Sequence, residues 1–327
     1  MLQAMSLPVV AVTMGDAAGV GPEIVAKALA HDDVWRRCRP LLVGDRGVFE
    51  RAAAAAGVDL ERSGVEVVTP PAAILDGTPV GQGDARAATA AAESLRAAYE
   101  LVAAGAVGAV VSAPLNKQAL HEAGYHYADE VAFLADVTGS AEPVLVGVIG
   151  AVATVSVTLH VPLRDVPGLL TRDRVARHAV ILAETIRALG RDARLALAAL
   201  NPHAGEGGLL GREEIDVLEP AVADARAAGI DLTGPVPADT VFPRAFAGEF
   251  DGVVCLYHDQ ANIARKLAGI GGASLFLGLP AVLGTTAHGT AYDIAGTGRA
   301  DPASLLSAID ACASLAAHAR AATPAAS

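Results

Sequence analysis

Three short apolar runs, each followed by a histidine, constrain this chain more than any other feature. The runs and their histidines are 153–159 with His160, 193–200 with His203, and 252–257 with His258. Two of the runs are flanked by helical patterns, which is typical of buried parallel strands. Ligands of an open parallel sheet bind beyond the carboxyl ends of its strands, so the three imidazoles are expected at one edge. Three imidazoles with an open fourth position predict a catalytic metal site.

Strand and helix patterns alternate along the rest of the chain, which predicts an α/β fold with mainly parallel sheets. Residues 125–136 are irregular and mixed in polarity, and they are the expected domain boundary. The strands are expected at 8–13, 41–44, 65–68, 108–112 and 144–149, the last forming a hairpin with 153–159. The helices are expected at 47–56, 84–104, 116–123, 171–189, 212–228 and 304–322, with another that has Pro22 in its first turn.

Composition excludes several classes of partner. The 327 residues include 24 basic and 36 acidic side chains, and a net charge of −12 argues against a nucleic-acid partner. No apolar run approaches the roughly 20 residues that a membrane span needs. The cysteines are three in number and far apart, so we expect no disulfide framework and a cytoplasmic location.

Several other segments are consistent either with ligand binding or with a purely structural role. The glycine-rich residues 15–24 follow the first strand, where backbone amides would bind an anion or only form a tight turn. Residues 288–296 would wrap a flat polar ligand or form an ordinary glycine loop. Lys266, eight residues after His258, would hold a carboxylate, move a proton or lie in solvent. Asp259 would orient an imidazole.

Taken together, these segments resemble the 4-hydroxythreonine-4-phosphate dehydrogenase family. The similarity covers nearly the whole chain, and its first and last segments are also similar to the wider isocitrate and isopropylmalate dehydrogenase superfamily. The segments that carry the resemblance are 15–23, 113–117, 160–164, 201–206, 237–240, 257–260 and 288–291.

The resemblance implies a homodimer of two-domain α/β/α subunits, with the active site in the cleft between the domains and shared across the dimer. The expected domains are residues 1–128 with 288–327, and residues 129–287. The family oxidises a secondary alcohol β to a carboxylate, and the resulting β-keto acid loses CO2. A small-molecule hydroxy acid is therefore the expected substrate.

The resemblance also implies roles for particular residues. A divalent ion, zinc before magnesium, manganese or cobalt, is expected on the histidines, one of them donated by the partner subunit. Lys266 is expected in substrate binding or proton transfer, and Asp239 in orienting the metal or the substrate. The residues that correspond to the family's metal ligands are His160, His203 and His258, and those expected to receive NAD are His288, Gly289, Thr290, Ala291 and Asp293.

The chain departs from the family where the substrate phosphate would bind. Glu130 and Val131 replace a histidine and a threonine, Ser274 replaces an asparagine, and Leu283 replaces an arginine. Each lost hydrogen bond to a charged group weakens phosphate binding by about 1.5–3 kcal/mol. We therefore expect a substrate without the phosphate, such as a sugar acid, an amino-acid derivative or a cyclic dihydrodiol carboxylate. The alternatives are a genuine 4-phosphohydroxy-L-threonine dehydrogenase, or a metal- and nucleotide-binding protein without turnover.

Overall fold

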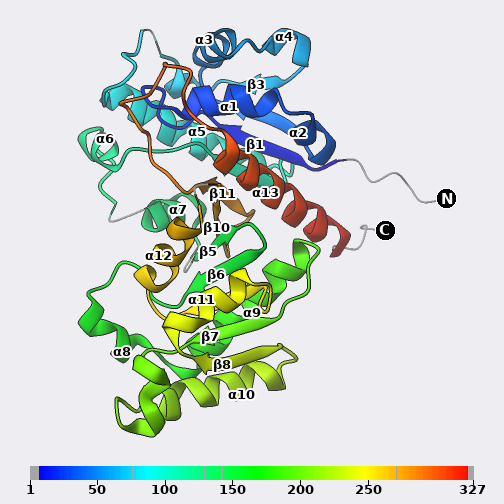
Figure 1. Ribbon diagram of the computed structural model, residues 1–327. Helices are drawn as coiled ribbons and strands as arrows, with labels where there is room; N and C mark the ends of the chain where they lie inside the picture. The colour runs from blue at the N-terminus through cyan, green and yellow to red at the C-terminus, as the bar shows by residue number, and fades with distance from the viewer. Residues whose placement is uncertain (1–6, 76, 128–129, 141–142, 270, 323–327) are drawn as a thin grey trace, which may run out of the picture. The chain divides into compact units, whose positions relative to one another are not determined.

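The chain folds into two units, each built around its own set of strands (Figure 1). The computed structural model describes residues 7–322, except 76, 128–129, 141–142 and 270. Unit 1 comprises Met1–Val144 and Ile270–Ser327, and unit 2 comprises Leu145–Gly269. Within the described ranges, no helix has the length and hydrophobicity needed to cross a membrane.

The described residues of unit 1 form six strands in the order β3-β2-β1-β4-β11-β10. Neighbouring strands are parallel except β10 and β11, which are antiparallel. The β1 strand is central, and all its residues from Val10 to Thr13 are buried. The strands are β1 (Val9–Thr13), β2 (Arg39–Val43), β3 (Glu66–Val68), β4 (Ala109–Ser112), β10 (Ala273–Leu277) and β11 (Leu283–Thr286).

The helices of unit 1 bury small side chains against these strands. The α5 helix packs on β1, β2 and β4 through alanines, and α13 packs on β4, β10 and β11. Asp84 caps α5 by accepting a hydrogen bond from Arg86 N at 2.8 Å. The helices are α1 (Gly21–Leu29), α2 (Asp32–Arg37), α3 (Arg46–Ala56), α4 (Leu60–Ser63), α5 (Ala85–Ala103), α6 (Lys117–Glu122), α7 (Glu130–Thr138) and α13 (Ala303–Ala322), with the 3-10 turn η1 (Pro71–Ala73).

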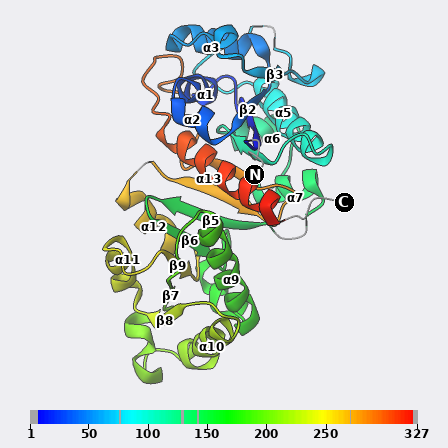
Figure 2. The same ribbon diagram turned by 90° about the vertical axis from the view of Figure 1, so that its right-hand side faces the viewer.

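Unit 2 contains five strands in the order β5-β6-β9-β7-β8. The hairpin of β5 and β6 is antiparallel, as its sequence predicts, and the remaining pairs are parallel. In Figure 2, α11 and α12 lie on one side of β6, β9 and β7, and α9 lies on the other. The strands are β5 (Val144–Ile149), β6 (Val152–Ser156), β7 (Leu195–Ala198), β8 (Leu232–Val236) and β9 (Gly252–Cys255).

The helices of unit 2 include one irregular turn. The stretch expected to form a single helix over 212–228 begins with the π-helical turn η4, before the α-helix α10. The elements are η2 (Leu163–Asp165), α8 (Val166–Leu169), α9 (Arg172–Ala188), η3 (Pro202–Gly208), η4 (Glu214–Leu218), α10 (Glu219–Ala227), α11 (Ala238–Phe246) and α12 (His258–Ala268).

The division between the units differs from the one expected from the sequence. It falls after Val144 and after Gly269 rather than after residues 128 and 287. Strands β10 and β11 belong to unit 1 because β11 pairs with β4. The interpretation of 125–136 as irregular is wrong for its second half, where Glu130 begins α7. Buried Phe133 and Leu134 anchor this helix, a pattern too short to recognise by periodicity.

Candidate metal and cofactor sites

The three strands that precede the candidate metal ligands are neighbours in unit 2. Strand β9 lies between β6 and β7 and is parallel to both. Ser156 pairs with Cys255, and Leu197 pairs with Val254, so the three strands end at the same edge. Each histidine follows the carboxyl end of one of these strands, as the sequence predicts.

His160 and His258 lie together at this edge. Their ring centroids are 5.2 Å apart, and the rings are inclined by 50°. Two imidazoles that bind one tetrahedral ion at about 2.1 Å place their ring centres roughly 5 Å apart, so this pair fits a divalent metal. His258 Nδ1 lies 2.7 Å from Asp259 Oδ1, which is the orienting contact expected of Asp259. This contact leaves Nε2 of His258 as the nitrogen for a ligand.

His203 lies on a loop with an unusual backbone. Residues 203–207 are five consecutive residues in the left-handed region, with a φ of 52° at His203. Non-glycine residues rarely adopt this conformation, so the surrounding contacts must hold it. The side chain of His203 is exposed. Among the described residues, no group of three His, Cys, Asp or Glu side chains is placed to hold a metal ion. The structure thus brings His160 and His258 together, but not all three histidines.

A buried carboxylate, Glu214, supports the start of the His203 loop. Its Oε1 accepts hydrogen bonds from Leu200 N at 2.9 Å and Asn201 N at 2.7 Å, and its Oε2 accepts one from Asn201 Nδ2 at 2.8 Å. Burial alone would raise the pKa of Glu214, but these hydrogen bonds hold it below its ordinary value. Gly205 is required here because a Cβ atom would lie 2.8 Å from Glu214 Oε2.

The two expected catalytic residues lie on helices beside this edge. Asp239 is exposed in the first turn of α11, and it lines the same groove as Asp259. Lys266 is exposed in the last turn of α12, about 12 Å along the helix axis from His258. Its neighbour Arg265 is buried over Gly147, where a Cβ would lie 2.1 Å from the guanidinium carbon.

In unit 1, the glycine-rich segment after β1 is hydrogen-bonded to the segment that contains the residues expected to bind NAD. Val20 N donates to Thr290 O at 2.9 Å, and Tyr292 Oη donates to Asp16 Oδ2 at 2.5 Å. Gly19 allows this approach because a Cβ there would lie 2.8 Å from Thr290 O. Two segments that are distant in sequence therefore form one loop cluster.

Burial and hydrogen bonding oppose each other at Asp16. Burial raises the pKa of Asp16, and the hydrogen bonds from Tyr292 and from Ala18 N offset only part of this shift. Burial beside Asp16 also raises the pKa of the Tyr292 phenol. Within the same cluster, Thr290 is buried and Ala291 has a φ of 42°. The other residues expected to bind the nucleotide, His288, Gly289 and Asp293, are exposed.

The residues that depart from the family pattern lie in three elements. Glu130 and Val131 begin α7, but their side chains lie outside the described residues. Ser274 is half-buried in β10, where it pairs with Thr285. Leu283 begins β11 and is fully buried. Its aliphatic side chain offers no hydrogen bond to a substrate.

Sequence reasoning missed Glu214 and the pairing of Asp16 with Tyr292. Glu214 lies in a stretch with an ordinary helical pattern, and only its burial distinguishes it from neighbouring carboxylates. Asp16 belongs to the glycine-rich motif, but its partner is 276 residues away along the chain. No local pattern indicates either contact.

Comparison with known proteins agrees with this arrangement of strands and loops. The family described as "Pyridoxal phosphate biosynthetic protein PdxA" matches residues 36–312. The chain is 42% identical over 321 residues to a 4-hydroxythreonine-4-phosphate dehydrogenase of Desulfosudis oleivorans, covering 93% of this chain and 94% of the relative. It is 39% identical over 322 residues to a D-threonate 4-phosphate dehydrogenase of Cupriavidus necator, covering 93% and 96%.

Solved structures extend the comparison to the fold. A 4-hydroxythreonine-4-phosphate dehydrogenase of Klebsiella pneumoniae superposes with a TM-score of 0.80 at 35% identity, covering 96% of this chain and 99% of that chain. A terephthalate 1,2-cis-dihydrodiol dehydrogenase of Burkholderia xenovorans superposes with a TM-score of 0.68 at 32% identity, covering 94% and 98%.

The fold and the relatives show that this α/β protein is an oxidoreductase, a dehydrogenase that acts on a CH–OH group. The chain belongs to the PdxA family.

Proposed function

We propose that this protein is an NAD- and divalent-metal-dependent dehydrogenase of a β-hydroxy acid that lacks the usual phosphate. The observation that carries the proposal is the 5.2 Å pair of His160 and His258 at one strand edge, with Asp259 orienting His258. This edge would hold the metal together with His203. The interlocked residues 288–293 of unit 1 would hold NAD.

The donor set determines what the site can do. A divalent ion held by neutral imidazoles would polarise the C–O bond of a substrate alcohol and make its hydroxyl more acidic. NAD would accept the hydride. Asp259 keeps Nε2 of His258 available by accepting from Nδ1, and Glu214 holds the start of the loop that carries His203.

The chain's own acid and base groups would complete the reaction. We assign Lys266 to the substrate carboxylate or to proton transfer, and Asp239 to the orientation of metal or substrate. Oxidation would give a β-keto acid; its bond to the carboxylate would then break with loss of CO2, the bonding electrons would form an enolate, and proton transfer to the α-carbon, a role open to Lys266, would complete the ketone product. We further propose a homodimer in which the partner subunit completes the site, as the family resemblance implies.

The side chains at the expected phosphate position support a substrate without a phosphate. An arginine would bind phosphate with two strong hydrogen bonds, whereas Leu283 provides none and is buried. Ser274 also offers less than the asparagine it replaces. The dihydrodiol dehydrogenase among the similar structures indicates that this fold accommodates a substrate named without a phosphate. A phosphorylated hydroxy acid is the second candidate, favoured by the names of the relatives at 39–42% identity.

The test is NADH formation, followed by absorbance, with 4-phosphohydroxy-L-threonine, D-threonate 4-phosphate, unphosphorylated sugar acids and a cis-dihydrodiol carboxylate. Each substrate is offered with zinc, magnesium, manganese or cobalt after removal of bound metal. We expect turnover with an unphosphorylated acid and at least tenfold lower kcat/KM with the phosphorylated ones. Efficient turnover of either phosphate ester would replace the first candidate by the second, and metal binding without turnover of any substrate would contradict both.

A further inference from the structure

Unit 1 contains a cavity that the proposed reaction does not use. It lies between α1, α3 and the segments 78–80 and 296–298, and its volume is about 230 Å³. Most of the wall is apolar and made of small side chains, including Ala17, Pro22, Val48, Ala52 and Ala55. None of the residues 288–293 proposed for NAD lines it.

Two buried oxygens on this wall have unused hydrogen-bonding capacity. Glu23 is 7% exposed, and its Oε2 has no hydrogen-bond partner among the described residues. The hydroxyl Oγ1 of Thr78 is likewise buried without a partner in that part of the chain. Both residues line the cavity. Buried polar atoms are normally satisfied, so two such atoms on one cavity indicate a ligand or water between them.

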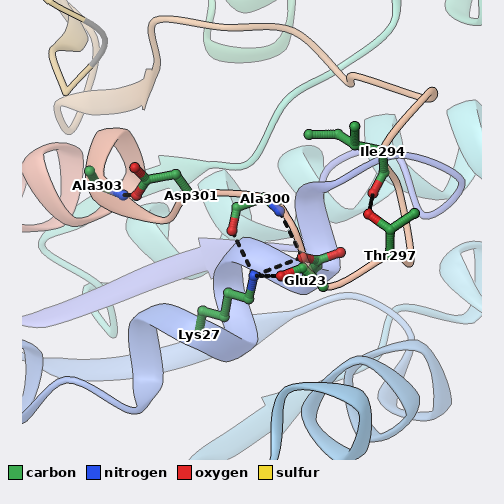
Figure 3. Close-up of polar contacts among 8 residues, drawn as sticks. Glu23, Lys27, Ile294, Thr297, Ala300, Asp301 and Ala303 are labelled. Carbon is green, nitrogen blue, oxygen red and sulfur yellow. Dashed lines mark hydrogen bonds and ion pairs between the residues drawn. The ribbon is translucent and has the colours of Figure 1, made fainter.

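The charges around the cavity restrict what this ligand can be. Lys27 Nζ donates to Glu23 Oε1 at 2.8 Å, to Gly298 O at 2.8 Å and to Ala300 O at 2.7 Å, as Figure 3 shows for Glu23 and Ala300. These contacts use all three ammonium donors, so Lys27 offers nothing to an anion. They also neutralise Glu23, which therefore favours an uncharged donor over a cation.

We propose that this cavity binds a neutral, flat heteroaromatic molecule of one or two rings that carries an N–H donor. The N–H group would donate to Glu23 Oε2, and a ring nitrogen beside it would accept from the Thr78 hydroxyl. The size agrees, because an apolar cavity of about 150 Å³ already holds a benzene ring. The alanines of α3 leave room for the rings, and Arg51 lines the same cavity with a planar guanidinium that can stack on them.

Three probes of similar size test this hydrogen-bond pattern by isothermal titration calorimetry on the full chain. 7-Azaindole has an N–H donor beside a ring-nitrogen acceptor, indole has only the donor, and benzofuran has no N–H. We expect 7-azaindole to bind at one site with a Kd on the order of 0.1–1 mM. Indole should bind more weakly, and benzofuran should bind about tenfold more weakly or not detectably.

Substitutions on the wall locate the binding. Ala52→Leu fills the cavity and should abolish 7-azaindole binding, whereas Ala54→Leu adds the same side chain to the exposed face of α3 and should leave it unchanged. Thr78→Val removes the unpartnered hydroxyl at nearly constant volume. It should erase the preference for 7-azaindole over indole while leaving the Tm of the free protein unchanged or higher.

Three outcomes would overturn the proposal. The first is that the three probes bind equally, or that no probe binds at millimolar concentration, which would mean that the cavity holds only water. The second is 7-azaindole binding that survives Ala52→Leu. The third is competitive displacement of 7-azaindole by NAD, which would assign the probe to the cofactor. Because binding is measured without turnover, failure of the proposed dehydrogenase reaction would not affect this result.

Discussion

The histidine edge of unit 2 and the loop cluster of unit 1 are held in different ways. His160 and His203 are exposed, and the ring of His258 is oriented by Asp259, the next residue in the sequence. Thr290 and Tyr292, by contrast, are tied to the glycine-rich segment by hydrogen bonds of 2.9 Å and 2.5 Å. In the histidine edge, the three histidines do not yet form a three-ligand group. In the loop cluster, internal hydrogen bonds already fix the positions of the side chains. A bound ion should therefore matter most for the first region, and internal contacts for the second.

The largest effect is expected at His203. His203→Ala removes one proposed ligand, so bound metal should fall below stoichiometry and kcat/KM should drop on the order of a thousandfold, since a catalytic metal contributes several kcal/mol. Metal content by atomic emission and NADH formation give the two readouts. His318→Ala, at an exposed histidine of α13, is the matched control and should change neither. Stoichiometric metal in His203→Ala would remove this residue from the ligand set.

A smaller effect is expected where the protein orients a ligand. Asp259→Asn keeps the shape but loses the charged acceptor 2.7 Å from His258 Nδ1, which should weaken metal binding about 10–100-fold. Competition with a chelator measures the affinity. Asp231→Asn, at an exposed aspartate before β8, should leave it unchanged. Equal metal affinity in the two variants would mean that Asp259 does not orient His258 in solution.

The smallest effect on activity is expected in unit 1. Tyr292→Phe breaks the hydrogen bond to buried Asp16, and it should lower the free energy of unfolding by about 1–3 kcal/mol and raise the KM for NAD. Tyr127→Phe breaks a 2.6 Å bond to the exposed Asp136, and it should change stability by about 0.5 kcal/mol or less. Thermal unfolding of both variants measures the contrast.

The effect of Tyr292→Phe should depend on pH in a definite direction. Burial raises the folded-state pKa of Asp16, so ionised Asp16 opposes folding as the pH rises through that value. Tyr292 lowers this pKa and therefore stabilises the ionised form. The stability difference between the wild type and Tyr292→Phe should be full at pH 8 and shrink as the pH falls toward the pKa of Asp16. A difference that stays constant with pH would contradict the role of the charged hydrogen bond.

Much of the fold follows from the sequence because its signals are local. Buried strands such as 252–255 appear as apolar runs, and the helices expected from residues 84 and 116 begin there, with Asp84 and Asn116 as the N-caps of α5 and α6. The unit boundary does not follow, because β11 joins unit 1 by pairing with β4, more than 170 residues away. Helix α7 is too short for a periodic pattern to reveal it.

The sequence by itself determined that three histidines follow three strands, that Asp259 adjoins one of them, and that a glycine-rich turn follows β1. These facts depend only on residue type and on contacts between near neighbours. The tertiary structure decided that β9 lies between β6 and β7, that Glu214 supports the His203 loop, and that Tyr292 meets Asp16. It also decided that Glu23 and Thr78 line one cavity. Such contacts depend on which distant segments the packing brings together, and no local pattern encodes that choice.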